Sequence, residues 1–264
     1  MRLVNYSDNA HYADLKDKVV FITGGCSGIG AALVRGFVTQ QAKVAFISND
    51  EAAGEALMTQ LENEIGDKEQ YLPMFLYCDV CDTDRLQACV EQVSTFMNGI
   101  DILINNAARD DRHTLDDLTP QQWDQSLNTN LRPYFFTAQS VAPAMAIKKC
   151  GSIINLSSNS AFLGLAGYPA YVTAKAAIVG MSKALGRELG GVGIRVNTLV
   201  PGWVMTEKQK KLWVTPQALE ECLAQQSLPQ TIEEDDIVQG ALFLASNASK
   251  MMTGQALIID GGRV

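Results

Sequence analysis

Histidine is scarce in this chain, and the few histidines do not cluster. His11 and His113 are the only two in 264 residues, and no group of cysteines and histidines has the spacing of a zinc site. This pattern excludes a cysteine and histidine metal centre, so we expect a site without a metal.

Positive charge is also in short supply. The 21 Lys and Arg residues are outnumbered by 29 Asp and Glu residues, and the formal net charge is −8. A protein that binds nucleic acid through its phosphates presents a basic face. We therefore expect no nucleic-acid partner.

Long hydrophobic runs are missing. Residues 1–18 are polar, and no apolar run approaches the roughly 18 residues that cross a membrane. The six cysteines lie mostly in apolar or small-residue surroundings, typical of reduced thiols, which predicts a cytoplasmic protein without membrane contact. Cys78 and Cys81 have CxxC spacing, but they follow a strand-like run rather than begin a helix, so no redox role is expected.

The rest of the composition is that of an ordinary globular protein. Hydrophobic residues make up 47%, charged residues 19% and aromatic residues 7% of the chain, which excludes disordered, collagen-like and coiled-coil classes. The length allows one large domain or two small ones, and no linker, charge block or repeat divides it. We predict a single domain over residues 16–264 behind a flexible segment, residues 1–15.

Short apolar runs alternate with segments of helical spacing. The runs are typical of strands buried on both faces: Val19–Ile22, Val44–Ile47, Met74–Cys78, Ile102–Ile104, Ile153–Leu156, Ile194–Val200 and Leu257–Ile259. Helical spacing occurs at Ala31–Gln40, Glu51–Ile65, Thr83–Met97, Pro120–Lys149 and Tyr171–Leu189. The alternation predicts an α/β fold, a doubly wound parallel sheet of about seven strands with helices on both faces.

One helical segment carries almost no charge. Lys175 is the only charged residue from Tyr168 to Ser182, and a helix that is apolar all round must be covered on both sides. One cover is the sheet, and the other is either a second copy of the chain or the chain's own residues 202–228. We predict a homo-oligomer, a dimer or a tetramer.

A glycine-rich turn joins the first predicted strand to the first predicted helix. Its sequence is Thr23-Gly24-Gly25-Cys26-Ser27-Gly28-Ile29-Gly30. Such a turn lets backbone N–H groups approach a pyrophosphate at a helix N-terminus. The GxxxGxG spacing at Gly24, Gly28 and Gly30, together with Thr23, resembles the short-chain dehydrogenase/reductase family, whose fold is of the Rossmann type.

The resemblance continues far along the chain. Ser158 lies 13 positions before Tyr171, and Tyr171 and Lys175 match the YxxxK pair of the family. Asn130, inside the long helical segment, matches an asparagine that holds a water in the proton path. The resemblance implies that Asn130, Ser158, Tyr171 and Lys175 are catalytic. It also implies a nicotinamide cofactor held by Gly24, Cys26, Ser27, Gly28, Ile29, Gly30, Ser48, Asn49, Asp50, Asp79, Val80, Asn106, Ala107, Ala108, Tyr171, Lys175, Pro201, Gly202, Val204 and Thr206.

Tyr171 and Lys175 are four residues apart, so on a helix they share a face. A tyrosine pKa is near 10, and a general base close to neutral pH needs a pKa lower by about two to three units. We expect the Lys175 cation and an oxidised nicotinamide ring to lower the Tyr171 pKa together. The resemblance assigns proton removal to Tyr171, hydrogen bonding of the reacting oxygen to Ser158, and contact with the ribose hydroxyls to Lys175.

The end of the second predicted strand bears on the choice of cofactor. Ser48, 18 residues past Gly30, stands where the family places an acidic residue that favours NAD, and it is neutral. Asp50 either substitutes for that residue or caps the following helix. No Arg or Lys occurs from Val44 to Gln60 to pair with the extra phosphate of NADP, so we favour NAD over NADP.

Three loops narrow the resemblance to the bacterial aldose 1-dehydrogenases of the xylose, arabinose and galactose type: Asn105–Leu115, Asn130–Phe136 and Pro201–Trp213. This implies oxidation of the C1 hydroxyl of an aldose to the lactone, with residues 202–228 as a lid over the substrate. The substrate-binding residues are then Arg109, Ser158, Asn159, Tyr171 and Trp203, whereas His113 is expected to be structural.

The apolar stretch Asn159–Leu165 keeps other substrates open. The alternatives within the family are a 3-oxoacyl thioester reductase and a hydrophobic secondary-alcohol dehydrogenase. An alternative of a different class is a dinucleotide-sensing protein without turnover, which the complete catalytic set disfavours.

Overall fold

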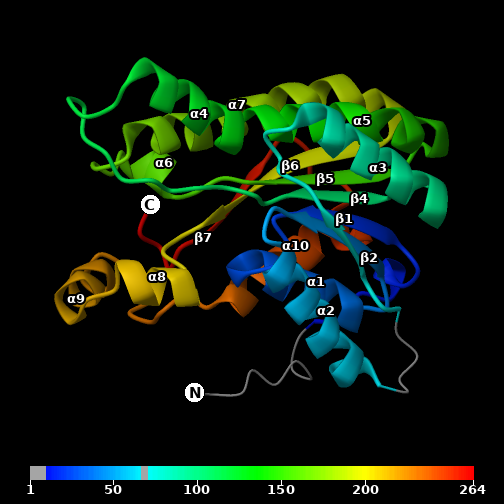
Figure 1. The fold of residues 1–264 in the computed structure, drawn as a ribbon, viewed down its shortest axis with the longest axis horizontal. Helices are drawn as coiled ribbons and strands as arrows, with labels where there is room; N and C mark the ends of the chain where they lie inside the picture. The colour runs from blue at the N-terminus through cyan, green and yellow to red at the C-terminus, as the bar shows by residue number, and fades with distance from the viewer. Residues whose placement is uncertain (1–9, 67–70) are drawn as a thin grey trace.

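The short apolar runs form the strands of one parallel sheet. The computed structural model describes residues 10–66 and 71–264, and in them seven strands pair in the order β3-β2-β1-β4-β5-β6-β7 (Figure 1). The strands are β1 (Val19–Thr23), β2 (Lys43–Ser48), β3 (Met74–Tyr77), β4 (Ile102–Asn105), β5 (Gly151–Leu156), β6 (Ile194–Pro201) and β7 (Ala256–Ile259). The order runs outward from β1 in both directions, which confirms the predicted doubly wound sheet.

Two helical layers cover the sheet (Figure 1). One contains α1 (Gly28–Thr39), α2 (Glu51–Ile65) and α10 (Glu234–Ala245), and the other contains α3 (Thr83–Met97), α4 (Pro120–Asn130), α5 (Arg132–Lys148) and α7 (Pro169–Leu189). Side chains of a strand point alternately to its two faces, so Val20 and Ile22 of β1 belong to the core under the first layer, whereas Phe21 belongs to the core under the second. Both cores are continuous across the sheet, as expected for a single domain.

The long helical segment predicted over Pro120–Lys149 is two helices. Helix α4 ends at Asn130, and α5 begins at Arg132 after Leu131, whose backbone is non-helical. Pro133 lacks an N–H, and in a continuous helix its ring would clash with the carbonyl four residues earlier, so a break just before it is favoured. Asn130 is therefore the last residue of a helix, not an interior one, and its side chain lies at a loop.

Residues 10–15, close to the N-terminus, pack against the rest of the domain. Within the segment expected to be flexible, Leu15 is buried, the N–H of Ala10 donates to Gln239 and that of Tyr12 donates to Gln40. The remainder of that segment, residues 1–9, lies outside the described residues. In the part of the chain described, no helix combines the length and apolarity needed to span a membrane.

The 202–228 segment forms two short helices, α8 (Glu207–Leu212) and α9 (Pro216–Ala224). They project beside β7 at the carboxyl ends of the central strands, on the side of the sheet away from α7 (Figure 1). Helix α7 instead packs against α4, α5 and the short helix α6 (Ser160–Leu163). The alternative cover considered for α7, the chain's own residues 202–228, is therefore wrong.

Candidate active site

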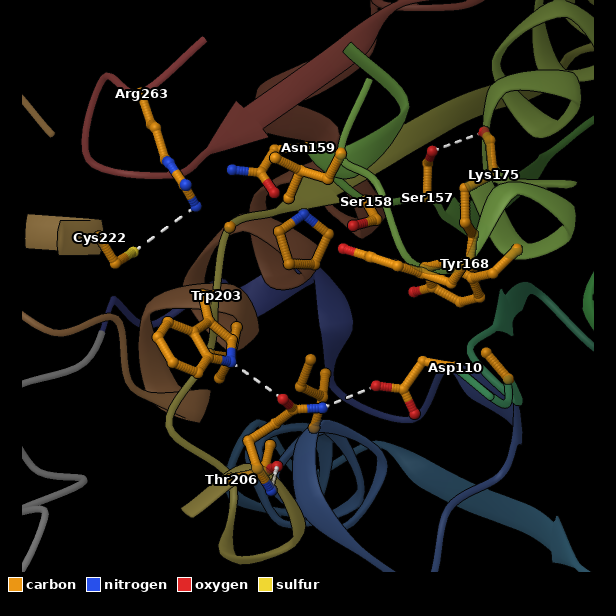
Figure 2. Close-up of a pocket in the computed structure, with 18 of the residues that line it drawn as sticks. Asp110, Ser157, Ser158, Asn159, Tyr168, Lys175, Trp203, Thr206, Cys222 and Arg263 are labelled. Carbon is orange, nitrogen blue, oxygen red and sulfur yellow. Dashed lines mark hydrogen bonds between the residues drawn. The ribbon is translucent and has the colours of Figure 1, made fainter. Parts of the chain in front are cut away.

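The loops that leave β1, β4, β5 and β6 line two adjoining cavities at the carboxyl edge of the sheet. One, the glycine-turn cavity, measures about 580 Å³. The other, the tyrosine cavity, measures about 430 Å³ and contains Ser158, Tyr171 and Lys175 in its wall (Figure 2). Ile29, Asn106, Ala108 and Thr206 line both cavities, so a long ligand can extend from one into the other.

The glycine turn is tightly closed against the loop after β4. The backbone φ of Gly24 is +68°, and a Cβ there would lie 2.8 Å from Cα of Ala107. A Cβ at Gly30 would overlap the carbonyl oxygen of Gly24. Ser27, the N-cap of α1, makes no side-chain cap hydrogen bond, so the first N–H groups of α1 have no side-chain cap and are available to a phosphate.

Thr23 joins the turn to the loop after β4. Its hydroxyl oxygen accepts hydrogen bonds from the N–H of Asn106 at 3.0 Å and of Ala107 at 3.1 Å. The side-chain amide of Asn106 donates in return to the carbonyls of Thr23 and Gly24. The two loops therefore form one rigid wall of the glycine-turn cavity.

Most of the residues expected to hold a dinucleotide line these cavities. Around the glycine-turn cavity lie Gly24, Cys26, Ser27, Ile29, Gly30, Ser48, Asn49, Asp50, Asp79, Val80, Asn106, Ala107, Ala108 and Thr206. The tyrosine cavity adds Pro201, Gly202 and Val204. Gly28, with φ of +49°, is the first residue of α1 and packs near Thr206.

Asp50 acts as a helix cap. Its carboxylate accepts a hydrogen bond from the N–H of Ala53 at 3.0 Å, and the same residue lines the glycine-turn cavity. Ser48 is buried, and its hydroxyl lies 2.8 Å from the Cys26 thiol. The edge of the cavity beside the glycine turn is thus neutral except for Asp50.

Lys175 is buried behind the tyrosine cavity. Its Nζ donates to the carbonyl of Leu156 at 2.8 Å and to the hydroxyl of Tyr134 at 3.0 Å, and it lies 5.6 Å from the ring centroid of Tyr171. Ser158 and Tyr171 line the tyrosine cavity together with Lys175. The three side chains therefore border one space.

Burial is the largest influence on the pKa values of Tyr171 and Lys175. It lowers the pKa of Lys175 to about 7, with the Asp110 carboxylate acting in the opposite direction. It raises the pKa of Tyr171 above the ordinary value, and Asp110 raises it further, whereas Ser158 and Arg112 lower it. The low Tyr171 pKa expected from the sequence therefore needs more positive charge than the chain alone supplies.

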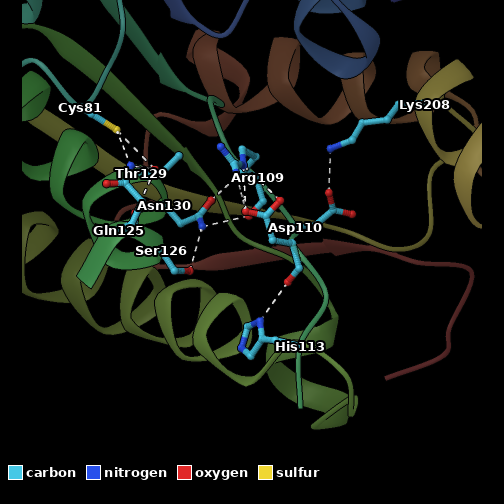
Figure 3. Close-up of polar contacts among 10 residues, drawn as sticks. Cys81, Arg109, Asp110, His113, Gln125, Ser126, Thr129, Asn130 and Lys208 are labelled. Atoms are coloured by element: carbon cyan, nitrogen blue, oxygen red, sulfur yellow. Dashed lines mark hydrogen bonds and ion pairs between the residues drawn. The ribbon is translucent and has the colours of Figure 1, made fainter. Parts of the chain in front are cut away.

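Asn130 makes its contacts with Arg109 and Ser126 instead (Figure 3). Its side-chain oxygen accepts from the N–H of Arg109 at 2.7 Å, and its amide nitrogen donates to the carbonyl of Arg109 at 3.0 Å and to Ser126 at 3.3 Å. Within the described residues no hydrogen bond joins it to Tyr171 or Lys175. Its observed role is to fix the loop after β4.

Comparison with known proteins gives the same assignment as the geometry. A family model described as enoyl-(acyl carrier protein) reductase matches residues 24–263. The chain is 41% identical over 254 residues to a protein named probable galactose dehydrogenase GalD from Rhizobium meliloti, covering 96% of this chain and 98% of that one. It is 40% identical over 254 residues to a D-xylose 1-dehydrogenase from Caulobacter vibrioides, with the same coverage. The chain belongs to the short-chain dehydrogenase/reductase family.

The structural comparison agrees. The crystal structure of a 3-oxoacyl acyl-carrier-protein reductase from Brucella melitensis superposes with a TM-score of 0.88 at 27% identity, covering 100% of this chain and 97% of that one. As a short-chain dehydrogenase/reductase, the chain is an oxidoreductase that acts on CH–OH groups with a nicotinamide cofactor. The glycine turn, its uncapped helix and the adjoining cavities fit such a cofactor.

Of the predicted substrate residues, Asn159 and Trp203 line the tyrosine cavity with Ser158 and Tyr171, but Arg109 does not. Asn130 holds the Arg109 backbone, and the guanidinium turns outward to pair with Asp111 at 2.6 Å. Arg112, from the same loop, lines the tyrosine cavity instead. The Arg112 guanidinium lies 3.8 Å from the ring centroid of Tyr168 and 4.8 Å from that of Trp213.

Sequence reasoning missed a chain of hydrogen bonds that crosses the mouth of this short-chain dehydrogenase site (Figures 2 and 3). Asp110 accepts from Nζ of Lys208 at 2.8 Å and from the amide of Gln209 at 2.9 Å. The Gln209 oxygen accepts from the indole N–H of Trp203 at 2.9 Å. These contacts tie the loop after β4 to α8.

His113 has the structural role expected of it. Its N–H donates to the carbonyl of Gly167 at 2.9 Å, and its Nε2 accepts from the N–H of Ala170 at 3.2 Å. It therefore joins the loop after β4 to the start of α7.

Proposed function

We propose that the chain oxidises the C1 hydroxyl of an aldose to the lactone, with Tyr171 as general base. The observation that carries this proposal is the lining of the tyrosine cavity. Beside Ser158 and Tyr171 it presents amide, carboxylate and guanidinium groups from Asn159, Asp110 and Arg112, with the Trp203 ring as an aromatic wall. A polyol needs such donors and acceptors around it, and the two aldose dehydrogenase relatives support the same substrate class.

We assign the following roles to the chain's own residues. Ser158 donates a hydrogen bond to the reacting oxygen, and Tyr171 accepts the proton from the substrate hydroxyl. Lys175 lies behind Tyr171, where its ammonium contacts the ribose hydroxyls and favours the tyrosinate. When bound, the oxidised nicotinamide supplies a hydride acceptor beside the substrate carbon. Loss of that hydride and of the hydroxyl proton leaves the lactone carbonyl.

We propose NAD as the cofactor. Cys26, Ser48, Asn49 and Asp50 line the glycine-turn cavity beside the turn, and none carries positive charge. The two cations in the lining, Arg109 and Lys208, pair with Asp111 and Asp110. A 2′-phosphate would meet the Asp50 carboxylate without a cation to balance it.

The proposed assembly is a homo-oligomer. The outward face of α5 carries Phe135 and Ile147, which are 42% and 85% exposed, and the outward face of α7 is small and uncharged at Thr173, Ala176 and Gly180. Exposed apolar side chains along one helix favour a subunit contact. Sedimentation at micromolar concentration tests this proposal, since a strict monomer overturns it. The cytoplasmic location stays a prediction.

The function is tested by following reduced cofactor at 340 nm, an absorbance specific to it, in a screen of aldoses and secondary alcohols with NAD and NADP. We expect aldose oxidation by the parent and no turnover by Tyr171→Phe, although that variant still binds cofactor. Tyr77→Phe, a change at an exposed tyrosine on β3, is the matched control. Substantial turnover by Tyr171→Phe would overturn the assignment of the base.

The second candidate function is reduction of a 3-oxoacyl thioester. Leu165 and Ala166 line the tyrosine cavity, and the reductase from Brucella melitensis shares the fold. Oxidation of reduced cofactor by an acetoacetyl thioester, without activity on any aldose, would favour this alternative.

A further inference from the structure

Arg263 stands in the wall of the tyrosine cavity, although nothing in the sequence singled it out. It extends from the C-terminal segment after β7 toward Cys222 of α9, on the side of the cavity away from Lys175 and Tyr168 (Figure 2). A substrate that contacts Ser158 and Tyr171 and extends across the cavity can therefore bring its far end to this guanidinium.

The position of Arg263 is built into the fold. Asp260, which is buried, accepts hydrogen bonds from the backbone N–H groups of Gly262 at 2.9 Å, Arg263 at 3.2 Å and Val264 at 3.0 Å. The same carboxylate accepts from the side-chain amide of Asn159 at 3.3 Å. One buried group therefore places the C-terminal segment relative to the residue that follows Ser158.

The Arg263 guanidinium has neutral partners. Its Nε and Nη2 donate to the side-chain oxygen of Gln225 at 3.0 and 2.7 Å, and Nη1 lies 3.6 Å from the Cys222 thiol. A guanidinium has five N–H donors, so these contacts leave one on each Nη nitrogen without a partner among the described residues. Two such donors form the fork that a carboxylate or phosphate accepts.

The charge of the cavity agrees with an anionic ligand. Its lining carries the two guanidinium cations Arg112 and Arg263 and the carboxylates Asp110 and Glu221, and Lys175 is buried in its wall. Asp110 is already paired with Lys208 at 2.8 Å, whereas neither Arg112 nor Arg263 has a carboxylate within 4 Å in the part of the chain described. A cavity with surplus positive charge in a chain of net charge −8 favours a substrate that supplies the missing anion.

We propose that the substrate is an anionic sugar, an aldose that carries a carboxylate or phosphate at the end remote from C1, and that Arg263 binds that group. This inference rests on the proposed aldose oxidation and narrows its substrate class. Arg263 is a specificity-determining residue in this proposal. It acts on the ground state and the transition state alike, because the anionic group does not change during the reaction.

The test compares three sugar classes on the intact enzyme with NAD. They are the hexuronates galacturonate and glucuronate, the hexose 6-phosphates, and the neutral parents galactose and glucose. We expect the preferred anionic class to exceed the neutral parents at least about tenfold in kcat/KM. Preference for uronates assigns the anion as a carboxylate, and preference for hexose phosphates assigns it as a phosphate.

Variants at Arg263 distinguish the loss of a charge that binds the substrate from a general disturbance of the fold. Arg263→Gln should raise KM for the anionic sugar about 10- to 100-fold with kcat changed less than about twofold, because a uniform binding interaction is lost. Its kcat/KM for the neutral parents should stay within about twofold, and cofactor affinity should not change. Arg263→Lys keeps the positive charge but not the two parallel N–H donors. Its KM for the anionic sugar should lie between those of the parent and Arg263→Gln. Lys16→Gln, an exposed charge removal before β1, is the control.

Glu221→Gln should change KM for the anionic sugar in the opposite direction to Arg263→Gln. Glu221 lines the same cavity, and its carboxylate repels an anionic substrate, so its removal should lower KM for that substrate. Neutral sugars preferred by the parent, or an Arg263→Gln effect equal for neutral and anionic sugars, would overturn this inference and leave the proposed function standing. Turnover of none of the sugars would overturn the proposed function itself.

Discussion

The hydroxyl of Tyr134 accepts a hydrogen bond from Nζ of Lys175 at 3.0 Å. The same hydroxyl contacts the carbonyls of Leu156 at 3.2 Å and Ala107 at 3.3 Å. Helix α5, the end of β5 and the loop after β4 therefore meet at one buried oxygen. Lys175 is positioned by this oxygen as well as by its place on α7, four residues after Tyr171.

Tyr134→Phe removes one acceptor from the Lys175 ammonium. A hydrogen bond to a charged group contributes about 1.5–3 kcal/mol, so kcat/KM should fall about 10- to 100-fold. Losing a bond to the charged form lowers the pKa of Lys175 further. Activity that depends on the cation should then disappear at lower pH than in the parent, as measured by kcat/KM against pH. An unchanged pH profile beside a uniform loss would show only a packing defect.

Lys175→Met should stabilise the fold at neutral pH while abolishing turnover. Burial lowers the pKa of Lys175 from 10.5 to about 7, so between these values the unfolded chain binds more protons than the folded one. Stability of the parent therefore rises as pH rises through this window. The variant lacks that slope, and Tyr134 still donates to Leu156 in it.

The stability advantage of Lys175→Met should accordingly shrink with pH. We expect a loss of about 1 kcal/mol per unit between about pH 7.5 and 9.5, measured by chemical unfolding of both proteins. Lys16→Met, at an exposed lysine, should show no such slope. A pH-independent difference between the parent and Lys175→Met would contradict the assignment of a lowered lysine pKa.

Features that depend on neighbouring residues were predictable from the sequence. The run Val19–Ile22 lies within β1, and Glu51–Ile65 and Thr83–Met97 match α2 and α3. The glycine turn was equally clear, because a tight strand-to-helix connection must use residues without a Cβ, as Gly30 does. The local sequence pattern is enough to predict a feature when all the residues that form it lie within a few positions of one another.

Features that depend on distant partners were not predictable. Tyr134 lies 41 residues from Lys175, and Asp110 lies 99 residues from Gln209. Before the fold is known, Tyr134 is one apolar helix residue among several. Arg109 and Arg112 lie in the same loop, and nothing local in the sequence distinguishes them. In the structure Asn130 holds the Arg109 backbone, and Arg112 lines the tyrosine cavity.

Asn49→Arg should shift cofactor use toward NADP. Asn49 is exposed at the glycine-turn cavity beside Asp50, so the new guanidinium can pair with a 2′-phosphate. We expect kcat/KM with NADP to rise at least about tenfold, measured by initial rates at equal cofactor concentration. Asp50→Asn removes the charge but keeps a good helix cap, and it should give a smaller gain. A parent enzyme that strongly prefers NADP would contradict the proposed NAD specificity.

Asp110→Asn should affect substrate binding and the proposed base in separable ways. The carboxylate holds Lys208 and Gln209 of α8, so weakening these contacts loosens α8 beside the cavity and should raise KM several-fold. Its charge also raises the pKa of Tyr171, and removing it lowers that pKa. Since a base becomes active as pH rises through its pKa, the acidic limb of the kcat profile should move to lower pH.

Variants on α8 distinguish these two effects of Asp110. Gln209→Ala breaks the contacts to Asp110 and to Trp203 but removes no charge near Tyr171, so it should raise KM and leave the acidic limb in place. Lys208→Ala leaves the Asp110 carboxylate without its cation and should move the limb to higher pH, opposite to Asp110→Asn. Equal shifts in all three variants would mean that the attachment of α8, not the Asp110 charge, sets the pH dependence.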